Sequence, residues 1–160
     1  MTKSIFLTSV FILVICLNTS AQFFNTADEL IYYTSEWTGE RFDDGRPRVP
    51  ADILERMKKV SIEEAWGVLR SKGYNNQFEG NWVILHEDRT LVGRALTAQY
   101  MPNRPEVMDR LTNKGHELGR VGAMNSWPID ALQQGDVYVA DGFGKVVDGT
   151  LIGDNLGNAI

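Results

Sequence analysis

The spacing of apolar residues follows a helical period in the first half of the chain. Residues 26–29 and 61–64 both carry the capping-box pattern, in which Thr26 or Ser61 caps a helix and a glutamate three positions later reaches back. Apolar residues follow each box at helical spacing, and a further helix is expected after Pro50. We therefore predict three short helices, the last of which stops at Gly73.

Beyond residue 80 the pattern predicts strands separated by one helix. Residues 82–85 and 91–98 are expected to be strands, and residues 136–140 give the clearest strand signal. A polar helix is expected to end near residue 118, and Asp148-Gly149 is a candidate hairpin turn. This order of helices and strands predicts a mixed α/β fold.

The four tryptophans bear on both the core and the function. Trp66 and Trp82 lie on apolar faces of the predicted elements and are expected in the core, whereas the positions of Trp37 and Trp127 stay open. Exposed tryptophans in an exported protein would also suit a carbohydrate-binding domain, since an indole ring stacks on sugars. Carbohydrate binding is therefore one of the functions considered for this chain.

The first residues have the features of an export signal. Lys3 precedes an apolar run over residues 5–17, which is too short to span a bilayer. Small residues end the segment, so residues 1–21 are expected to be a signal peptide cleaved before Gln22. The only cysteine, Cys16, lies inside this segment. The mature protein is then exported, periplasmic or secreted, without disulfides or thiolate metal ligands and without a stable membrane span.

Composition and charge exclude several classes of protein. The 160 residues contain 43% hydrophobic and 23% charged residues, a globular balance, and the formal net charge is −5. No run of lysine and arginine is present, so nucleic acid is not an expected partner. His86 and His116 are too far apart for a zinc motif. Three arginines, Arg41, Arg46 and Arg48, are expected on a solvated arm or a subunit contact.

The candidate chemistry lies in the last residues. The predicted strand at 136–140 ends in Asp141-Gly142, and a later segment leads into Gly153-Asp154-Asn155-Leu156. We expect these four residues to form a turn into a helix with Asp154 as N-cap. Unpaired amides at such a turn suit an anionic group, and Asp154 can cap the helix or face a cation.

These stretches resemble one known family. The segment from Gly135 through Asp141-Gly142 to Gly153-Asp154-Asn155-Leu156 resembles the central part of the RraA-like family, and Gly93-Arg94-Ala95 resembles its early strand. The family includes the regulator of ribonuclease activity A and the 4-hydroxy-4-methyl-2-oxoglutarate aldolases. The resemblance runs from about Val49 to Ile160. With the signal peptide at 1–21 and a helix and linker arm at 22–48, both expected from the residue pattern, the resemblance implies an RraA-like domain at 49–160 whose C-terminal part is missing.

The resemblance implies a fold and an activity. The fold is a β/β/α swivelling domain with N-terminal helices, assembled as a trimeric homo-oligomer. The activity is a metal-dependent lyase, a class II aldolase or oxaloacetate decarboxylase that releases pyruvate through an enolate. A divalent Mg²⁺ or Mn²⁺ ion would spread the charge of that enolate.

Carried onto this chain, the resemblance assigns Asp154 as the catalytic aspartate, and the backbone of Gly153, Asp154, Asn155 and Leu156 would hold the substrate carboxylate. The family's Arg-Asp pair, whose aspartate ligates the metal, falls about 20 residues after Asp154 and so beyond Ile160. We expect the 160-residue chain to be an inactive fragment of a longer lyase. The alternative is a non-catalytic interaction or regulatory module on the same fold.

Overall fold

The computed structural model describes residues 26–160. The expected signal peptide at 1–21 and its cleavage before Gln22 lie outside these residues. Among the described residues, no helix is long and apolar enough to cross a membrane. The elements follow in the order α2 (Ala27–Tyr33), α3 (Ala51–Met57), α4 (Ile62–Ser71), β1 (Arg94–Gln99), α5 (Pro105–Glu117), α6 (Trp127–Asp130), β2 (Asp136–Asp141) and α7 (Asp154–Gly157).

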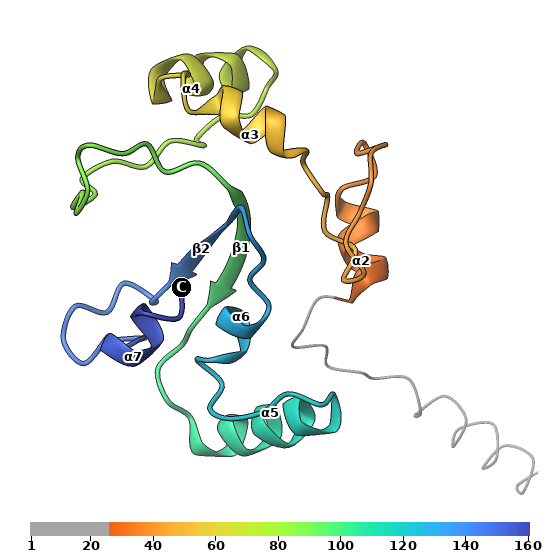
Figure 1. Ribbon diagram of the computed structural model, residues 1–160. Coiled ribbons are helices and arrows are strands. Elements are labelled where there is room, and N and C mark those ends of the chain that lie inside the picture. Colours follow the sequence, from red (N-terminus) through yellow and green to blue (C-terminus); the bar gives the residue numbers. More distant parts are fainter. Residues whose placement is uncertain (1–25) are drawn as a thin grey trace, which may run out of the picture.

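The strands β1 and β2 form a small parallel sheet in the middle of the molecule (Figure 1). Arg94 lies opposite Asp136 at one end of the pair, and Gln99 lies opposite Asp141 at the other. Parallel neighbours need a long crossover, which here is the stretch of residues 100–135 that contains α5 and α6. The structure is therefore of mixed helix and strand type, as the sequence pattern predicts.

The two faces of β1 differ sharply in burial. Leu96 is buried, whereas its neighbours Ala95 and Thr97 point to the other face and are exposed. The short helix α6 contacts β1 and contributes Trp127 and Ile129, which are buried together with Leu96. These three side chains are the apolar core of the described residues.

A glycine of α5 makes room for the largest core side chain. A Cβ atom on Gly115 would overlap the indole ring of Trp127. The ring also meets His116 edge-on at a centroid distance of 6.3 Å, and its Nε1 donates a hydrogen bond of 3.0 Å to the Val121 carbonyl. Trp127 is only 4% exposed, so the position left open by the sequence pattern belongs to the core.

The helices of the first half are confirmed. The side chains of Thr26 and Ser61 each accept the N–H of a glutamate three residues on, and each glutamate carboxylate accepts the N–H of the cap residue in return. The helix expected after Pro50 is α3, and α4 ends two residues before Gly73, whose φ of +87° suits glycine. Local capping chemistry was sufficient to locate these ends.

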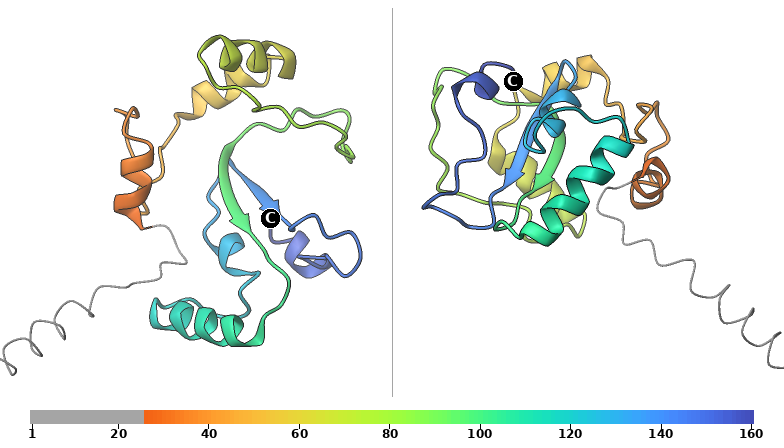
Figure 2. Two further views of the ribbon diagram at one scale, coloured as in Figure 1. Left: turned by 180° about the vertical axis from the view of Figure 1, so that it is seen from behind. Right: turned by 90° about the horizontal axis from the view of Figure 1, so that it is seen from below.

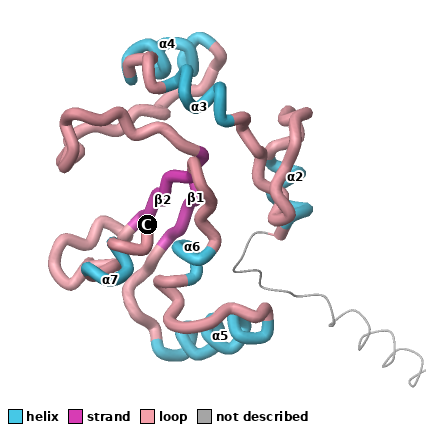
Figure 3. Tube along the Cα trace, viewed as in Figure 1, coloured by secondary structure: helices cyan, strands magenta, loops and turns pink. Residues whose placement is uncertain are grey.

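Two expected strand segments are wrong in the described structure. Residues 82–85 lie in the long loop between α4 and β1, and no strand forms on either side of Asp148-Gly149 (Figure 3). Both segments have strand composition, but among residues 26–160 they meet no neighbouring strand. An apolar run without a partner has no ladder to join, and the backbone stays irregular.

Two expected core tryptophans also require correction. Trp82 is 71% exposed in that loop, and its Nε1 donates only to the Glu79 carbonyl. Trp66 is 37% exposed and packs on Phe78 at 5.9 Å between ring centroids. The left view of Figure 2 shows why, since α3 and α4 are set apart from the strand pair there rather than laid over it. Neither indole reaches the core at β1.

Candidate functional site

The turn at residues 153–156 begins the last helix, as the sequence predicts. Gly153 rather than Asp154 is the N-cap of α7, and Asp154 is the first helical residue. Asp154 Oδ1 accepts the N–H of Asn155 at 2.9 Å, so the carboxylate caps a neighbouring amide locally. Gly153, Asp154 and Asn155 are exposed, and Leu156 is half-buried.

The space beside Gly153 is open. Gly153 has ordinary extended angles, and a Cβ placed on it would meet no described atom within 4 Å. The fold itself therefore does not require glycine at this position. The turn is anchored two residues earlier, because Asn125 Nδ2 donates a 2.9 Å hydrogen bond to the Leu151 carbonyl.

Among the described residues, the region around the turn at 153–156 contains no complete set of metal ligands. Within residues 26–160, no three aspartate, glutamate, histidine or cysteine side chains are grouped so that they could hold one ion. Asp154 supplies a single carboxylate, and one of its oxygens is already bonded to Asn155. The described residues thus hold at most part of a site for the Mg²⁺ or Mn²⁺ that the resemblance implies.

A pair of tyrosines joins the two strands on the covered face. The hydroxyls of Tyr100, directly after β1, and Tyr138, in β2, are 2.7 Å apart. Burial, reinforced by the hydrogen bond with Tyr100, raises the pKa of Tyr138. The Tyr138 phenol is therefore protonated at neutral pH, and the hydrogen-bonded pair is a polar link between the two strands.

The strongest electrostatic feature lies at the opposite end of the strand pair. The Asp136 carboxylate has no exposed side-chain surface and receives Arg94 Nε at 2.8 Å and Arg46 Nη1 at 3.0 Å. Arg94 also donates to the Val49 and Gln134 carbonyls, and the N–H of Gln133 bonds Asp136 at 3.1 Å. Burial alone would raise the pKa of Asp136, but these hydrogen bonds outweigh it and lower the pKa.

This cluster corrects the expectation of a solvated arginine arm. Arg46 is only 13% exposed at its side chain, and Arg41 donates four hydrogen bonds to Thr34, Trp37 and Gly45. Arg46, Arg48 and Arg94 all place their guanidinium carbons 5.2–5.5 Å from the centre of the Phe42 ring. Of the three arginines predicted on the arm, only Arg48 is mainly exposed.

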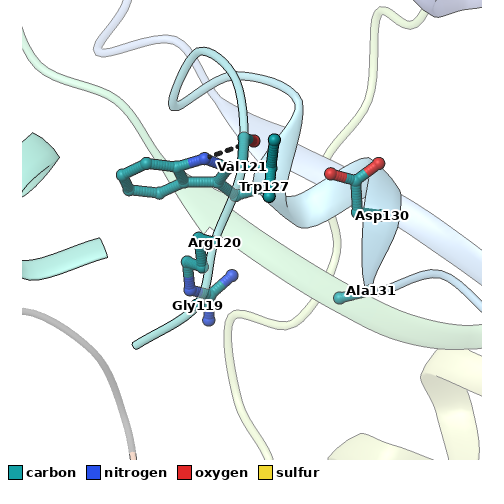
Figure 4. A pocket seen from close by; sticks show the side chains of 6 residues that line it. All are labelled: Gly119, Arg120, Val121, Trp127, Asp130 and Ala131. Atoms are coloured by element: carbon teal, nitrogen blue, oxygen red, sulfur yellow. Dashed lines mark hydrogen bonds between the residues drawn. The ribbon is translucent and has the colours of Figure 1, made fainter. Parts of the chain in front are cut away.

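A small pocket lies beside the buried tryptophan. Its walls come from the loop after α5 and from α6, and it encloses about 260 Å³ (Figure 4). Arg120 lies on one wall, 5.8 Å from the Trp127 ring, and Asp130 lies on another. A volume below the usual lower limit of about 300 Å³ for ligand clefts gives this pocket no assigned role.

Comparison with known proteins adds no relative. No family model, no curated protein and no solved structure matches this chain.

The sequence pattern missed the Arg46–Asp136–Arg94 cluster entirely. The three residues are separated by up to 90 positions, and the local sequence around each one is compatible with an ordinary charged residue on the surface. One available signal was Asp136 itself, a carboxylate at the first position of the most apolar strand. A charge at such a position needs a partner, although the pattern does not say which.

Proposed function

We propose that this chain is part of an RraA-like, metal-dependent lyase that cleaves 4-hydroxy-2-oxo acids or oxaloacetate to pyruvate. The proposal rests on the resemblance of residues 93–98, 135–142 and 153–156. One structural observation supports it: the first two of these stretches, far apart in the sequence, lie side by side as the parallel strands β1 and β2. The finer assignment to a β/β/α swivelling domain is part of the same proposal.

In this proposal the turn at 153–156 holds the substrate carboxylate. The first amides of a helix have no backbone partner within it. Asp154 Oδ1 already accepts the Asn155 amide, and the open space at Gly153 gives a small anion access to the rest of the turn. Asp154 orients the turn by capping the Asn155 amide, which leaves its second oxygen for the reacting end of the substrate. The divalent ion, Mg²⁺ or Mn²⁺, would stabilise enolate charge when bound.

Two remaining parts of the proposal follow from the resemblance: the active protein is a homo-oligomer, a trimer, and it acts on small 2-oxo acids. Its export follows from the signal-like pattern of residues 1–21. The Arg-Asp pair expected after Asp154 supplies the groups absent from residues 26–160.

The proposal is tested first on the gene and then on the protein. The coding sequence is read past codon 160, and the full reading frame is assayed for pyruvate release from oxaloacetate and 4-hydroxy-4-methyl-2-oxoglutarate, with Mg²⁺ and with a chelator. We expect metal-dependent turnover that Asp154→Asn reduces at least about 100-fold, as removal of an essential charged group does. Asp148→Asn, which changes another exposed carboxylate in the preceding loop, leaves turnover unchanged. Absence of pyruvate release from every substrate would refute the lyase.

A second candidate, a non-catalytic interaction module, is favoured by one observation. Large apolar side chains remain exposed over much of the described chain, including all four residues of 82–85. Patches of this kind mark contact surfaces. If the reading frame stops at Ile160 and the protein has no lyase activity, this candidate replaces the first.

A further inference from the structure

A second cleft lies between the N-terminal arm and the beginning of the strand pair. It encloses about 700 Å³, within the range typical of small-molecule sites. The arm contributes Trp37, Glu40, Phe42 and Arg48, and the turn before β2 contributes Gln133 and Gln134. None of these residues belongs to the turn at 153–156, so the cleft is independent of the proposed lyase site.

The arm wall of the cleft is held rigidly. Residues 40–48 fold back on themselves, with the N–H of Arg48 on the Glu40 carbonyl at 2.9 Å and the N–H of Phe42 on the Arg46 carbonyl at 3.0 Å. Gly45, at the tip, has a φ of +88°, and a Cβ there would strike the backbone of Ala27. Arg46 fixes this hairpin to Asp136. The wall is thus preformed, which lowers the entropic cost of binding a ligand.

The same wall presents one cation with free hydrogen-bonding capacity. The Arg48 guanidinium is oriented by its position over Phe42, and its side chain is 58% exposed. Within the described residues its only ionic partner is Glu40, at 3.7 Å, a carboxylate that is itself 82% exposed. An exposed pair of that length contributes little, so an anion can displace Glu40 at small cost.

The charge balance favours a singly charged ligand. Arg46 and Arg94 are already neutralised by Asp136, with Asp44 as a further partner of Arg46. One guanidinium is therefore left for the ligand, and its planar fork matches a carboxylate. A phosphate dianion would require a second free cation. The Trp37 indole lines the same cleft as Arg48 and offers a flat apolar surface. It is held in place by a 2.8 Å hydrogen bond from its Nε1 to the Glu40 carbonyl.

We propose that this cleft binds a small aromatic or heteroaromatic carboxylate. The carboxylate pairs with Arg48, the ring lies against Trp37, and the exposed amides of Gln133 and Gln134 hydrogen-bond polar ring substituents. Glu40 acts as a competing internal anion that the ligand displaces.

Calorimetric titration of the full chain with indole-3-carboxylate tests the site. We expect saturable binding, at least tenfold weaker binding of the neutral indole-3-carboxamide, and no competition from equimolar inorganic phosphate. Arg48→Gln weakens binding at least tenfold. Arg89→Gln is the matched control, since Arg89 is an exposed arginine with a 3.6 Å ion pair to Asp88 outside the cleft. The Arg89→Gln variant is expected to bind indole-3-carboxylate with unchanged affinity.

The effect of Glu40→Gln separates this site from general anion attraction. Removing the competing carboxylate is expected to tighten binding two- to fivefold, while Glu55→Gln, an equal charge change on α3, leaves affinity unchanged. Far-UV circular dichroism checks that each variant is folded. No binding at 10 mM probe, equal loss in Arg48→Gln and Arg89→Gln, or displacement by phosphate would each overturn the proposal. Binding that persists in Asp154→Asn shows that the cleft is distinct from the lyase site.

Discussion

At the scale of single residues, one buried carboxylate organises several parts of the chain. Asp136 begins β2, and its hydrogen bonds come from the arm, from the start of β1 and from the turn before β2. Taking a carboxylate out of water is costly unless its oxygens are fully bonded, and here both are. The stability of the arm therefore depends on this side chain.

Asp136→Asn is expected to lower the free energy of unfolding by about 3 kcal/mol, because two largely buried guanidinium groups lose their counter-charge. Asp44→Asn is the control, since Asp44 is 46% exposed and has Arg46 as its ionic partner. It should cost less than about 1 kcal/mol. Urea unfolding at neutral pH measures both, and equal losses would contradict the central role of Asp136.

The same carboxylate gives the fold an acid dependence of defined sign. Its pKa is lower in the folded chain than in the unfolded chain. The stabilisation it provides is thus present at neutral pH and is lost as the pH falls below about 4, the unfolded value, towards the lower folded value. The stability difference between the native chain and Asp136→Asn should shrink over this interval. A difference that stays constant down to pH 3 would show that Asp136 carries no buried charge.

At the scale of elements, the sequence predicts features that depend on neighbouring residues better than features that depend on distant partners. Both capping boxes, the helix after Pro50 and the stop at Gly73 follow from side chains within a few positions, and all are found in the structure. The strand at 136–140 is also present, because β1 pairs with it along its whole length and α6 packs on β1. Residues 82–85 have the same composition without the partner, and composition alone does not supply one.

The two candidate sites differ in the same way in how far the sequence predicts them. The turn at 153–156 was predictable, because a glycine followed by Asp154 is a local helix-start signal. The cleft lined by Trp37 and Arg48 was not, because it depends on a bond between Arg46 and Asp136 across 90 positions.

The contact between α5 and α6 gives a prediction for a matched pair of helical glycines. Gly115→Ala is expected to cost about 2 kcal/mol, since the new methyl group would displace the buried Trp127 ring. Gly67→Ala in α4 meets no described atom within 4 Å and should gain about 0.5–1 kcal/mol through helix propensity. Thermal or urea unfolding separates them, and changes of the same sign in both would refute the packing assigned to Gly115.

At the scale of the whole molecule, the described chain buries little apolar surface. Leu96, Trp127 and Ile129 are buried, while many large apolar side chains lie exposed on α4, in the loop at 82–85 and beyond β2. A parallel strand pair is normally covered on both faces, but here one face of β1 is exposed. This distribution is typical of a chain that completes its core against another surface.

If the oligomer of the proposed function is correct, the chain should self-associate through the exposed apolar loop at 82–85. The double variant Val83→Glu, Leu85→Glu is expected to shift sedimentation at micromolar concentrations towards the monomer. Val83 and Leu85 are 86% and 84% exposed, so the new charges disturb no described core contact. Val146→Glu, at a valine after β2 that is 96% exposed and lies outside this loop, is the control and should leave sedimentation unchanged. Monomeric behaviour of the unmodified chain at all concentrations would contradict this prediction.

The bond between Arg46 and Asp136 also sets an order of events during synthesis. Arg46 is made 90 residues before its partner, and at about 5–20 residues per second the ribosome needs roughly 5–20 s to bridge that interval. During this time the arm can form its own hairpin, but Asp136 has not yet been made. The cleft between the arm and the strand pair therefore does not yet exist. The N-terminal part of the described chain is thus among the first made and the last to be fixed in place.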